Sequence, residues 1–217
     1  ADILLVDQPG TFRVQTVISK GILVTEKGEN KFEYTVPRRD DSLLHTVQHA
    51  PLTADDFAYH VDMDEGKAVV ETINSIGPFM RRRRDVELDV RGGIVRPSAE
   101  KDVALVSVIE RYGINGNMSK GFISGWSFKK GAIATTVPPD DNNLVVAGAN
   151  YDDMALAANT LIEQGGGQVV VIDGKIVSFL PLPIAGIASD LTPEELAQKE
   201  NELDEAAKAI GSRLPDP

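Results

Sequence analysis

Short apolar runs separated by glycine-containing turns dominate the first part of the chain. Runs of aliphatic and β-branched residues are typical of strands, and a glycine in a tight turn between two such runs is typical of a hairpin. Over residues 1–36 this pattern predicts a small β unit with turns at Lys20-Gly21 and Lys27-Gly28. The chain begins inside its first apolar run, so we expect it to be part of a longer polypeptide.

A polar connector with two prolines follows at residues 37–58, where one short helix is expected to begin at Thr53. Strand-like runs return from Tyr59 onward, with turns predicted at Gly66 and at Gly92-Gly93. The predicted strands of this second part occupy residues 66–75, 85–97, 102–113, 121–126, 131–137 and 143–150.

The period of the pattern changes after Asn150. A helical face is formed there by Met154, Ala157, Ala158, Leu161 and Ile162. We expect Asp152 to cap the start of this helix and Gly165 to end it. The dipeptide Asp173-Gly174 then predicts a hairpin with a type I′ turn.

The last predicted helix runs from Thr192 to Ile210. It begins with a capping box, Thr192-Pro193-Glu194-Glu195, which has proline at the first helical position. Leu196, Leu203 and Ile210 form an apolar seam along it, and an exposed seam would favour a role in assembly. Many strands combined with two helices predict an α+β fold with mostly antiparallel or mixed sheets flanked by a few helices.

The chain is acidic and contains no cysteine. Its 33 acidic and 22 basic residues give a net charge of -11, so a phosphate backbone would be repelled over most of the surface. The absence of cysteine excludes disulfides, zinc–thiolate sites and thiol catalysis. No apolar run approaches the roughly 20 residues that span a bilayer. We therefore expect a cytoplasmic protein that binds neither nucleic acid nor a membrane.

The histidines and the basic run offer weak signals for a site. His45 and His49 are spaced for one helix face, but Thr46 stands where a zinc protease would need a glutamate, so we interpret the histidines as surface or connector residues. The glycines after Gln164 follow a helix and predict a helix stop instead of a phosphate-binding loop. The arginines at 81–84 precede acidic residues suited to local ion pairs, and contact with another domain or an anionic ligand stays open.

Two polar loops are stronger candidates. The segment 111–122 is rich in glycine and asparagine, so it predicts either a wide turn or a loop that lines a pocket. The segment 138–143 contains two prolines, two aspartates and two asparagines, which suit a turn between strands. The same aspartates and asparagines can donate to or accept from a ligand.

Three long segments together resemble the C-terminal domain of bacterial adenine deaminases. They read RYGINGNMSKGFISGWSFKKGAIATTV, VVAGANYDDMALAANTLIEQGGGQVVV and LPLPIAGIASD, and the match is close from Val103 to Asp190. The resemblance implies that residues 1–36 are strands of the small β domain that follows the barrel of an amidohydrolase. It further implies that residues 37–58 are a connector and that residues 59–217 form the adenine deaminase C-terminal α+β domain.

This resemblance implies that the intact enzyme hydrolyses adenine to hypoxanthine and ammonia at a Mn or Fe centre. In this family the metal is held by a His-x-His pair, further histidines and an aspartate of the barrel. This chain has three histidines and no His-x-His, so we expect no metal within it and expect its own N-terminal barrel to be a partner. The chain would then support the barrel, shape the pocket for a purine base and contribute to a homo-oligomer.

The family pattern also assigns roles to the 138–143 loop. Its members usually read Ala-His-Asp-Ser-His-Asn there, and this chain retains Asp140 and Asn143 while Pro139 and Asn142 replace the two histidines. The resemblance therefore makes Asp140 and Asn143 candidate catalytic side chains. The remaining candidates, for substrate binding, are Asn115, Asn117, Asp141 and Asn142. Two alternatives stay open: a non-catalytic assembly domain of an amidohydrolase with another substrate, and a purine-binding domain.

Overall fold

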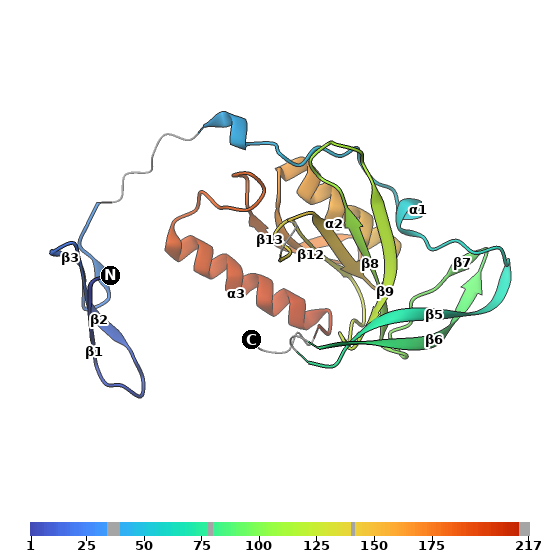
Figure 1. Ribbon diagram of the computed structural model, residues 1–217, viewed down its shortest axis with the longest axis horizontal. Helices are drawn as coiled ribbons and strands as arrows, with labels where there is room; N and C mark the ends of the chain where they lie inside the picture. Colours follow the sequence, from blue (N-terminus) through green and yellow to red (C-terminus); the bar gives the residue numbers. More distant parts are fainter. Residues whose placement is uncertain (34–39, 78–79, 140–141, 213–217) are drawn as a thin grey trace. The chain divides into compact units, whose positions relative to one another are not determined.

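The computed structural model describes residues 1–33, 40–77, 80–139 and 142–212 (Figure 1). The chain divides into two compact units, Ala1–Arg39 and Asp40–Pro217. Among the described residues, no helix is long and apolar enough to cross a membrane. The α+β fold predicted from the sequence is confirmed.

The first unit is a four-stranded antiparallel sheet in the order β1-β2-β3-β4. Its strands are β1 (Ile3–Val6), β2 (Val14–Ser19), β3 (Ile22–Glu26) and β4 (Glu29–Asn30). The hairpin turns at Lys20-Gly21 and Lys27-Gly28 have left-handed backbones, which confirms both predicted turns. None of the described side chains of this unit is buried, so this sheet has no core of its own.

The second unit is built on a nine-stranded sheet in the order β13-β12-β10-β11-β8-β9-β5-β6-β7. The pairing of β5 with β9 is parallel, and the other pairings of this sheet are antiparallel. The strands are β5 (Glu65–Ser75), β6 (Arg81–Arg91), β7 (Ile94–Val95), β8 (Val103–Ile109), β9 (Met118–Ser124), β10 (Ala132–Thr135), β11 (Leu144–Gly148), β12 (Gly167–Ile172) and β13 (Lys175–Pro181).

Helices cover both faces of this sheet (Figure 1). The helices α1 (Ala54–Phe57) and α2 (Tyr151–Gln164) pack on one face, and α3 (Pro193–Ala209) packs on the other against β12 and β13. A short 3₁₀ turn at Asp41–Leu43 precedes them. Residues 40–58, predicted as a connector, therefore belong to the compact second unit, where Phe57 is fully buried.

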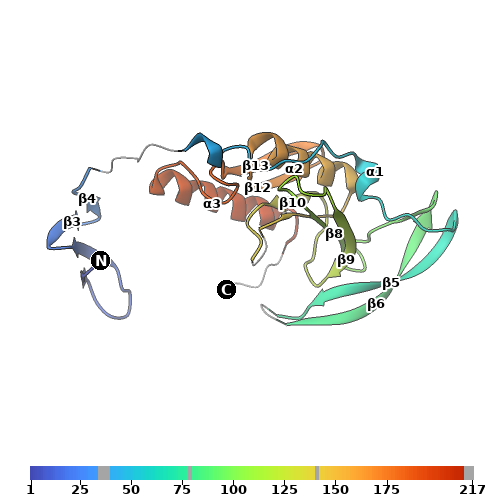
Figure 2. The same ribbon diagram turned by 45° about the horizontal axis from the view of Figure 1, so that its top comes forward.

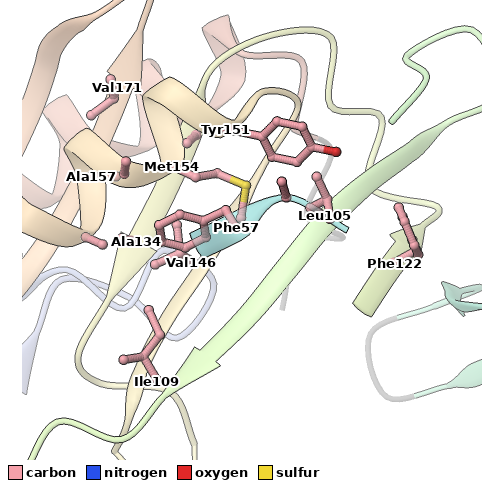
Figure 3. Packing of buried hydrophobic residues seen from close by; sticks show 14 of the residues in the cluster. Phe57, Leu105, Ile109, Phe122, Ala134, Val146, Tyr151, Met154, Ala157 and Val171 are labelled. Carbon is pink, nitrogen blue, oxygen red and sulfur yellow. The ribbon is translucent and has the colours of Figure 1, made fainter. Parts of the chain in front are cut away.

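The main core lies between the sheet and α2. Figure 3 shows Phe57 of α1, Met154 of α2 and Val146 of β11 close together, and each is fully buried. Neighbouring valines of β12 point to opposite faces, because Val169 and Val171 belong to this core whereas Val170 packs with α3. Burial on both faces explains why β12 is a continuous apolar run.

The β5–β6 hairpin differs, because it extends beyond the helices (Figure 2). In β6 buried Val86, Leu88 and Val90 alternate with exposed polar side chains. The basic run 81–84, not assigned to a strand from the sequence, forms the first part of β6. The turn predicted at Gly66 was wrong: this glycine lies inside β5 with φ 144, where the ladder with β6 continues.

The caps of the two long helices were predicted in part. At α2 the N-cap is Asn150 instead of Asp152, and its side chain accepts a hydrogen bond from the backbone N–H of Asp153. Gly165 ends the helix in the left-handed conformation, as predicted. At α3 the capping box of Thr192 and Glu195 is confirmed. The seam of α3 is not exposed, since Leu203 and Ile210 are buried against the sheet and Leu196 is half-buried.

Candidate functional site

Three long loops gather at one end of the large sheet. Because the strands are antiparallel, β8, β10 and β13 end where β9, β11 and β12 begin. We call this side the loop end, and its described residues are 110–117, 136–139, 142–143 and 182–188. The opposite side carries residues 99–102, 125–131, 149–150 and 173–174, and we call it the turn end.

Arg111 is the central side chain of the loop end and is only 1% exposed. Its Nε donates to the carbonyl of Asn142 at 2.5 Å, and its two terminal nitrogens donate to Thr46 Oγ1 at 3.2 Å and to the carbonyl of Ala185 at 3.1 Å. Among the described residues no carboxylate forms an ion pair with it. Neutral oxygens from three distant segments thus satisfy a buried cation.

Tyr112 strengthens the link between two of the loops. The Arg111 guanidinium lies 4.7 Å from the centre of the Tyr112 ring, and the Tyr112 hydroxyl donates to the carbonyl of Asn142 at 3.2 Å. Asn142 itself has a left-handed backbone, with φ 50. The end of the 138–143 loop that enters β11 is therefore fixed against the loop that follows β8.

Glu110 organises the loop after β8 from within. Its carboxylate accepts hydrogen bonds from the backbone N–H groups of Tyr112 at 2.5 Å, Ile114 at 3.0 Å, and Asn115 and Gly116 at 3.1 Å. Partial desolvation acts to raise the pKa of Glu110, but these four N–H groups outweigh it and hold the pKa below its usual value. The role of this carboxylate is therefore to hold the backbone of the loop together.

Thr136 and Gly186 close the loop end on its other side. The Thr136 hydroxyl is buried, donates to the carbonyl of Gly186 at 2.6 Å and accepts from the N–H of Gly167 at 2.8 Å. Gly186 has φ 70, and a Cβ built on it would lie 2.4 Å from a terminal nitrogen of Arg111. Glycine is thus required at position 186 for both backbone conformation and space.

Residues 79–217 match the family model of the adenine deaminase C-terminal domain. The chain belongs to this family. Over 217 residues it is 53% identical to adenine deaminase 1 of Latilactobacillus sakei subsp. sakei (strain 23K) and 48% identical to adenine deaminase 1 of Desulfotalea psychrophila. Each alignment covers 100% of this chain but 36% of the relative, so the chain spans about a third of the length of these relatives.

The site residues predicted for this adenine deaminase C-terminal domain have different placements. Asn142 is half-buried and gives its backbone carbonyl to Arg111, and Asn143 is half-buried directly before β11. Asn115 Oδ1 accepts from the N–H of Asn117 at 2.8 Å, so the loop uses its side chain, whereas Asn117 is exposed. Asp140 and Asp141 lie outside the described residues.

Sequence reasoning missed Arg111, the residue that joins the segments of the loop end. A single arginine in a glycine-rich stretch reads as a surface side chain. The available signal was its position two residues beyond the buried end of β8, next to an aromatic residue. A long side chain at that position can reach the loops that leave the neighbouring strands, and here it reaches the carbonyls of Asn142 and Ala185.

The histidines do not form a site together. His49 Nδ1 lies 2.7 Å from the carbonyl of Ala50, His60 Nε2 lies 3.1 Å from Asp55 Oδ1, and His45 is exposed in a segment that is not helical. Within the described ranges, no three histidine, aspartate or glutamate side chains are grouped so that they could hold a metal ion. These residues do not fit a Mn or Fe centre, so we derive no step through a metal from them.

Proposed function

We propose that this chain forms the C-terminal part of an adenine deaminase, which hydrolyses adenine to hypoxanthine and ammonia, and that its loop end helps to shape the purine pocket. Relatives named adenine deaminase align with every residue of the chain, and this supports the assignment. The observation that carries the role of the loop end is the buried Arg111, which holds the 138–143 loop in place through Asn142.

The chemistry of the proposed reaction needs a group that the described residues do not supply. In metal-dependent hydrolases a bound metal provides an activated water molecule at neutral pH. The proposal therefore assigns Mn or Fe, and the barrel that would hold it, to the part of the enzyme beyond this chain. This chain would then act through binding and positioning.

Several side chains of the loop end are suited to contact a purine in the proposed pocket. A purine edge presents both hydrogen-bond donors and acceptors, and an asparagine amide can pair with either. A carboxylate can accept a hydrogen bond from the exocyclic amino group, and once protonated it can donate the proton that this group needs in order to leave as ammonia. We accordingly assign these roles to Asn143 and Asp140, with Asn115, Asn117, Asp141 and Asn142 as further candidates for contact with the base.

A chimeric enzyme tests this proposal directly. The matching C-terminal part of the Latilactobacillus sakei deaminase is replaced by this chain, which is 53% identical to it, and ammonia release from adenine is measured with added Mn. We expect turnover by the chimera and none by the isolated chain. A folded chimera that releases no ammonia from any aminopurine would contradict the deaminase assignment.

Point variants of the chimera then test the loop. Asp140→Ala and Asn143→Ala should lower kcat by about 100-fold or more, the usual effect of losing a group that transfers or orients a proton. The matched controls are Asp204→Ala and Asn201→Ala, because both side chains are exposed on α3. Equal effects of loop variants and controls would remove the loop from the mechanism.

The assembly alternative has a distinct outcome in the same experiment. It drew support from an exposed seam on α3, and that support is lost because Leu203 and Ile210 are buried. Unchanged turnover in the Asp140→Ala and Asn143→Ala chimeras, together with a changed oligomer size, would restore it.

A further inference from the structure

A pocket lies beside the end of β6, between that strand and the segment that leads to β8. Its volume is about 450 Å³, and pockets that hold small molecules typically measure roughly 300–1,000 Å³. None of its lining residues belongs to the loop end, and we call it the β6 pocket. The residues that line it are Leu88, Asp89, Arg91, Arg96, Pro97, Ser98, Glu100 and Lys101.

Backbone hydrogen bonds hold the walls of the β6 pocket in place. The N–H of Arg96 donates to the carbonyl of Asp89 at 2.8 Å, and Ser98 and Val103 exchange two bonds of 2.9 Å. Pro97 restricts the backbone between these contacts. The side chains of the pocket therefore project from a backbone that needs little rearrangement to bind a ligand.

Arg96 brings a half-buried guanidinium to the pocket. The guanidinium lies 5.9 Å from the centre of the Tyr151 ring, and one terminal nitrogen donates to the carbonyl of Arg91 at the long distance of 3.4 Å. Among the described residues no carboxylate forms an ion pair with Arg96. Because a guanidinium carries several N–H donors in one plane, Arg96 can still donate to two oxygens of a ligand.

Lys101 and Ser98 add donors from the turn that precedes β8. The ammonium of half-buried Lys101 donates to the carbonyl of Glu87 at 2.6 Å, which leaves further N–H groups for a ligand. The Glu87 carboxylate is bonded to Lys67 at 2.8 Å and makes no ion pair with Lys101. The Ser98 hydroxyl accepts from the backbone N–H of Lys101 at 3.3 Å, and its own hydrogen can be donated to a ligand.

The charges of the β6 pocket favour an anion, although two carboxylates also line it. Arg91 pairs with Asp89 at 3.4 Å, so these two charges largely offset each other. The other cations are Arg96 and Lys101, and the other carboxylate is Glu100, which is exposed. The pocket thus has an excess of positive charge within a chain whose net charge is -11.

We propose that the β6 pocket binds a phosphate group, either as the free ion or as the monoester of a small organic molecule. A phosphate dianion has several acceptor oxygens, so it can accept hydrogen bonds from Arg96, Lys101 and Ser98 at the same time. Leu88 and Pro97 supply apolar surface, and the volume leaves room for the organic part of a monoester. The site does not depend on the deaminase assignment.

Proton–nitrogen correlation spectra of the 217-residue chain test the proposal, with sodium phosphate and phenyl phosphate as probes and sodium chloride of equal ionic strength as the reference. We expect saturable shifts at the amides of Ser98 and Lys101, with a Kd of about 1 mM or below. Tighter binding of phenyl phosphate would identify a monoester as the ligand, and equal or weaker binding would identify the free ion. Shifts that do not saturate by about 20 mM, that saturate at other residues, or that chloride reproduces overturn the proposal.

Uncharged variants identify the side chains that bind phosphate. Arg96→Gln and Lys101→Gln should each weaken binding by about tenfold or more, because each removes a charged donor. Lys175→Gln is the matched control for Lys101→Gln, since it removes the same charge from an exposed lysine of β13, and it should change the affinity by less than about twofold. Equal effects at Lys101 and Lys175 would reveal general attraction to the chain and contradict the site.

Glu100→Gln separates phosphate binding from a loss of folding. This change removes the carboxylate that opposes an anion in the β6 pocket, so binding should become about threefold tighter. A variant that had merely lost its fold could not gain affinity. Binding that is not strengthened in folded Glu100→Gln would contradict the proposed balance of charges.

Discussion

At each end of the large sheet, backbone groups stabilise a buried charged side chain, but the two charges have opposite signs. At the turn end, the carboxylate of Asp153 accepts from the N–H groups of Gly174 at 2.8 Å and Asp173 at 3.2 Å, and Asp102 accepts from those of Gly125 and Ser127. At the loop end, Arg111 donates to carbonyl groups instead. Among the described residues neither Asp153 nor Arg111 has an ion-pair partner, although both are almost fully buried.

This difference shows how the sign of a buried charge selects the structure around it. A carboxylate gathers N–H groups: Asp153 holds the two-residue turn at 173–174, and Asp102 holds the start of the connection 125–131. A guanidinium gathers oxygens instead, and Arg111 joins three segments that are far apart in the chain, at Thr46, Asn142 and Ala185. The backbone of the loop end is therefore held by Arg111 at Asn142 and Ala185.

The largest expected effect is at Gly186, where the loop end has no spare room. Gly186→Ala places a methyl group against the Arg111 guanidinium and keeps a left-handed backbone, so it should lower the free energy of unfolding by about 3 kcal/mol or more. Gly174→Ala at the turn end is the matched control, with φ 72 and open space around the new atom, and should cost about 1 kcal/mol. Urea unfolding of both variants measures the difference. Equal losses of unfolding free energy would show that the Arg111 side chain moves aside to accommodate the methyl group.

A smaller effect is expected at the turn end from Asp153→Ala. This change removes the charged acceptor of the N–H groups of Asp173 and Gly174, which lie in an exposed turn, and the loss of these two hydrogen bonds should cost about 2 kcal/mol in urea unfolding. Asp153→Asn keeps an acceptor oxygen and should cost less. Asp152→Ala, on the exposed side of the same helix, is the control, and a loss there as large as at Asp153 would contradict the comparison.

The smallest effect is expected at Glu110 and depends on pH. The pKa of Glu110 lies below its usual value of 4.5, so the folded state holds this proton less tightly than the unfolded state. Its contribution to stability is therefore complete above pH 4.5 and is lost as the pH falls through the lower folded pKa. Unfolding of the parent chain and of Glu110→Gln should differ near neutral pH and converge once the pH lies below the lowered folded pKa of Glu110.

The exposed Glu200 of α3 supplies the control for the Glu110 experiment. Glu200→Gln should leave the pH dependence of unfolding close to that of the parent chain. A constant difference between Glu110→Gln and the parent chain across this pH range would show that hydrogen-bond geometry, not ionisation, is what the loop requires.

Local features of the fold were predictable because a few neighbouring residues decide them. The turn at Asp173-Gly174 and the capping box at Thr192 depend on backbone preferences and short-range hydrogen bonds, and both are present. Asn150 and Asp152 are both good caps, and the sequence alone could not choose between them. The end of β11 decides it, because the chain leaves the sheet at Gly148 and the helix begins at Tyr151.

Features that depend on distant segments were not predictable from the sequence. Arg111 can be buried because Thr46, Asn142 and Ala185 supply oxygens around it. No local sequence pattern predicts hydrogen bonds between segments so far apart in the chain. The burial of the α3 seam likewise depends on β12 and β13 lying beneath it. The two candidate loops were predicted from their composition, and their contact through Asn142 emerges only in the folded chain. The functional roles assigned to the residues of both loops remain predictions: Asn115, Asn117, Asp140, Asp141, Asn142 and Asn143.

The parallel junction between β5 and β9 has a consequence for the order of folding. The hydroxyls of Thr72 and Ser124 meet there at 2.8 Å although 52 residues separate them in the chain. The β5–β6 and β8–β9 hairpins can each form from residues that are near in the chain. Pairing β5 with β9 closes a long loop, and it gains little free energy until both hairpins have formed. We therefore expect the β5–β6 hairpin to dock late during folding, and we expect the sheet to open first at this parallel junction.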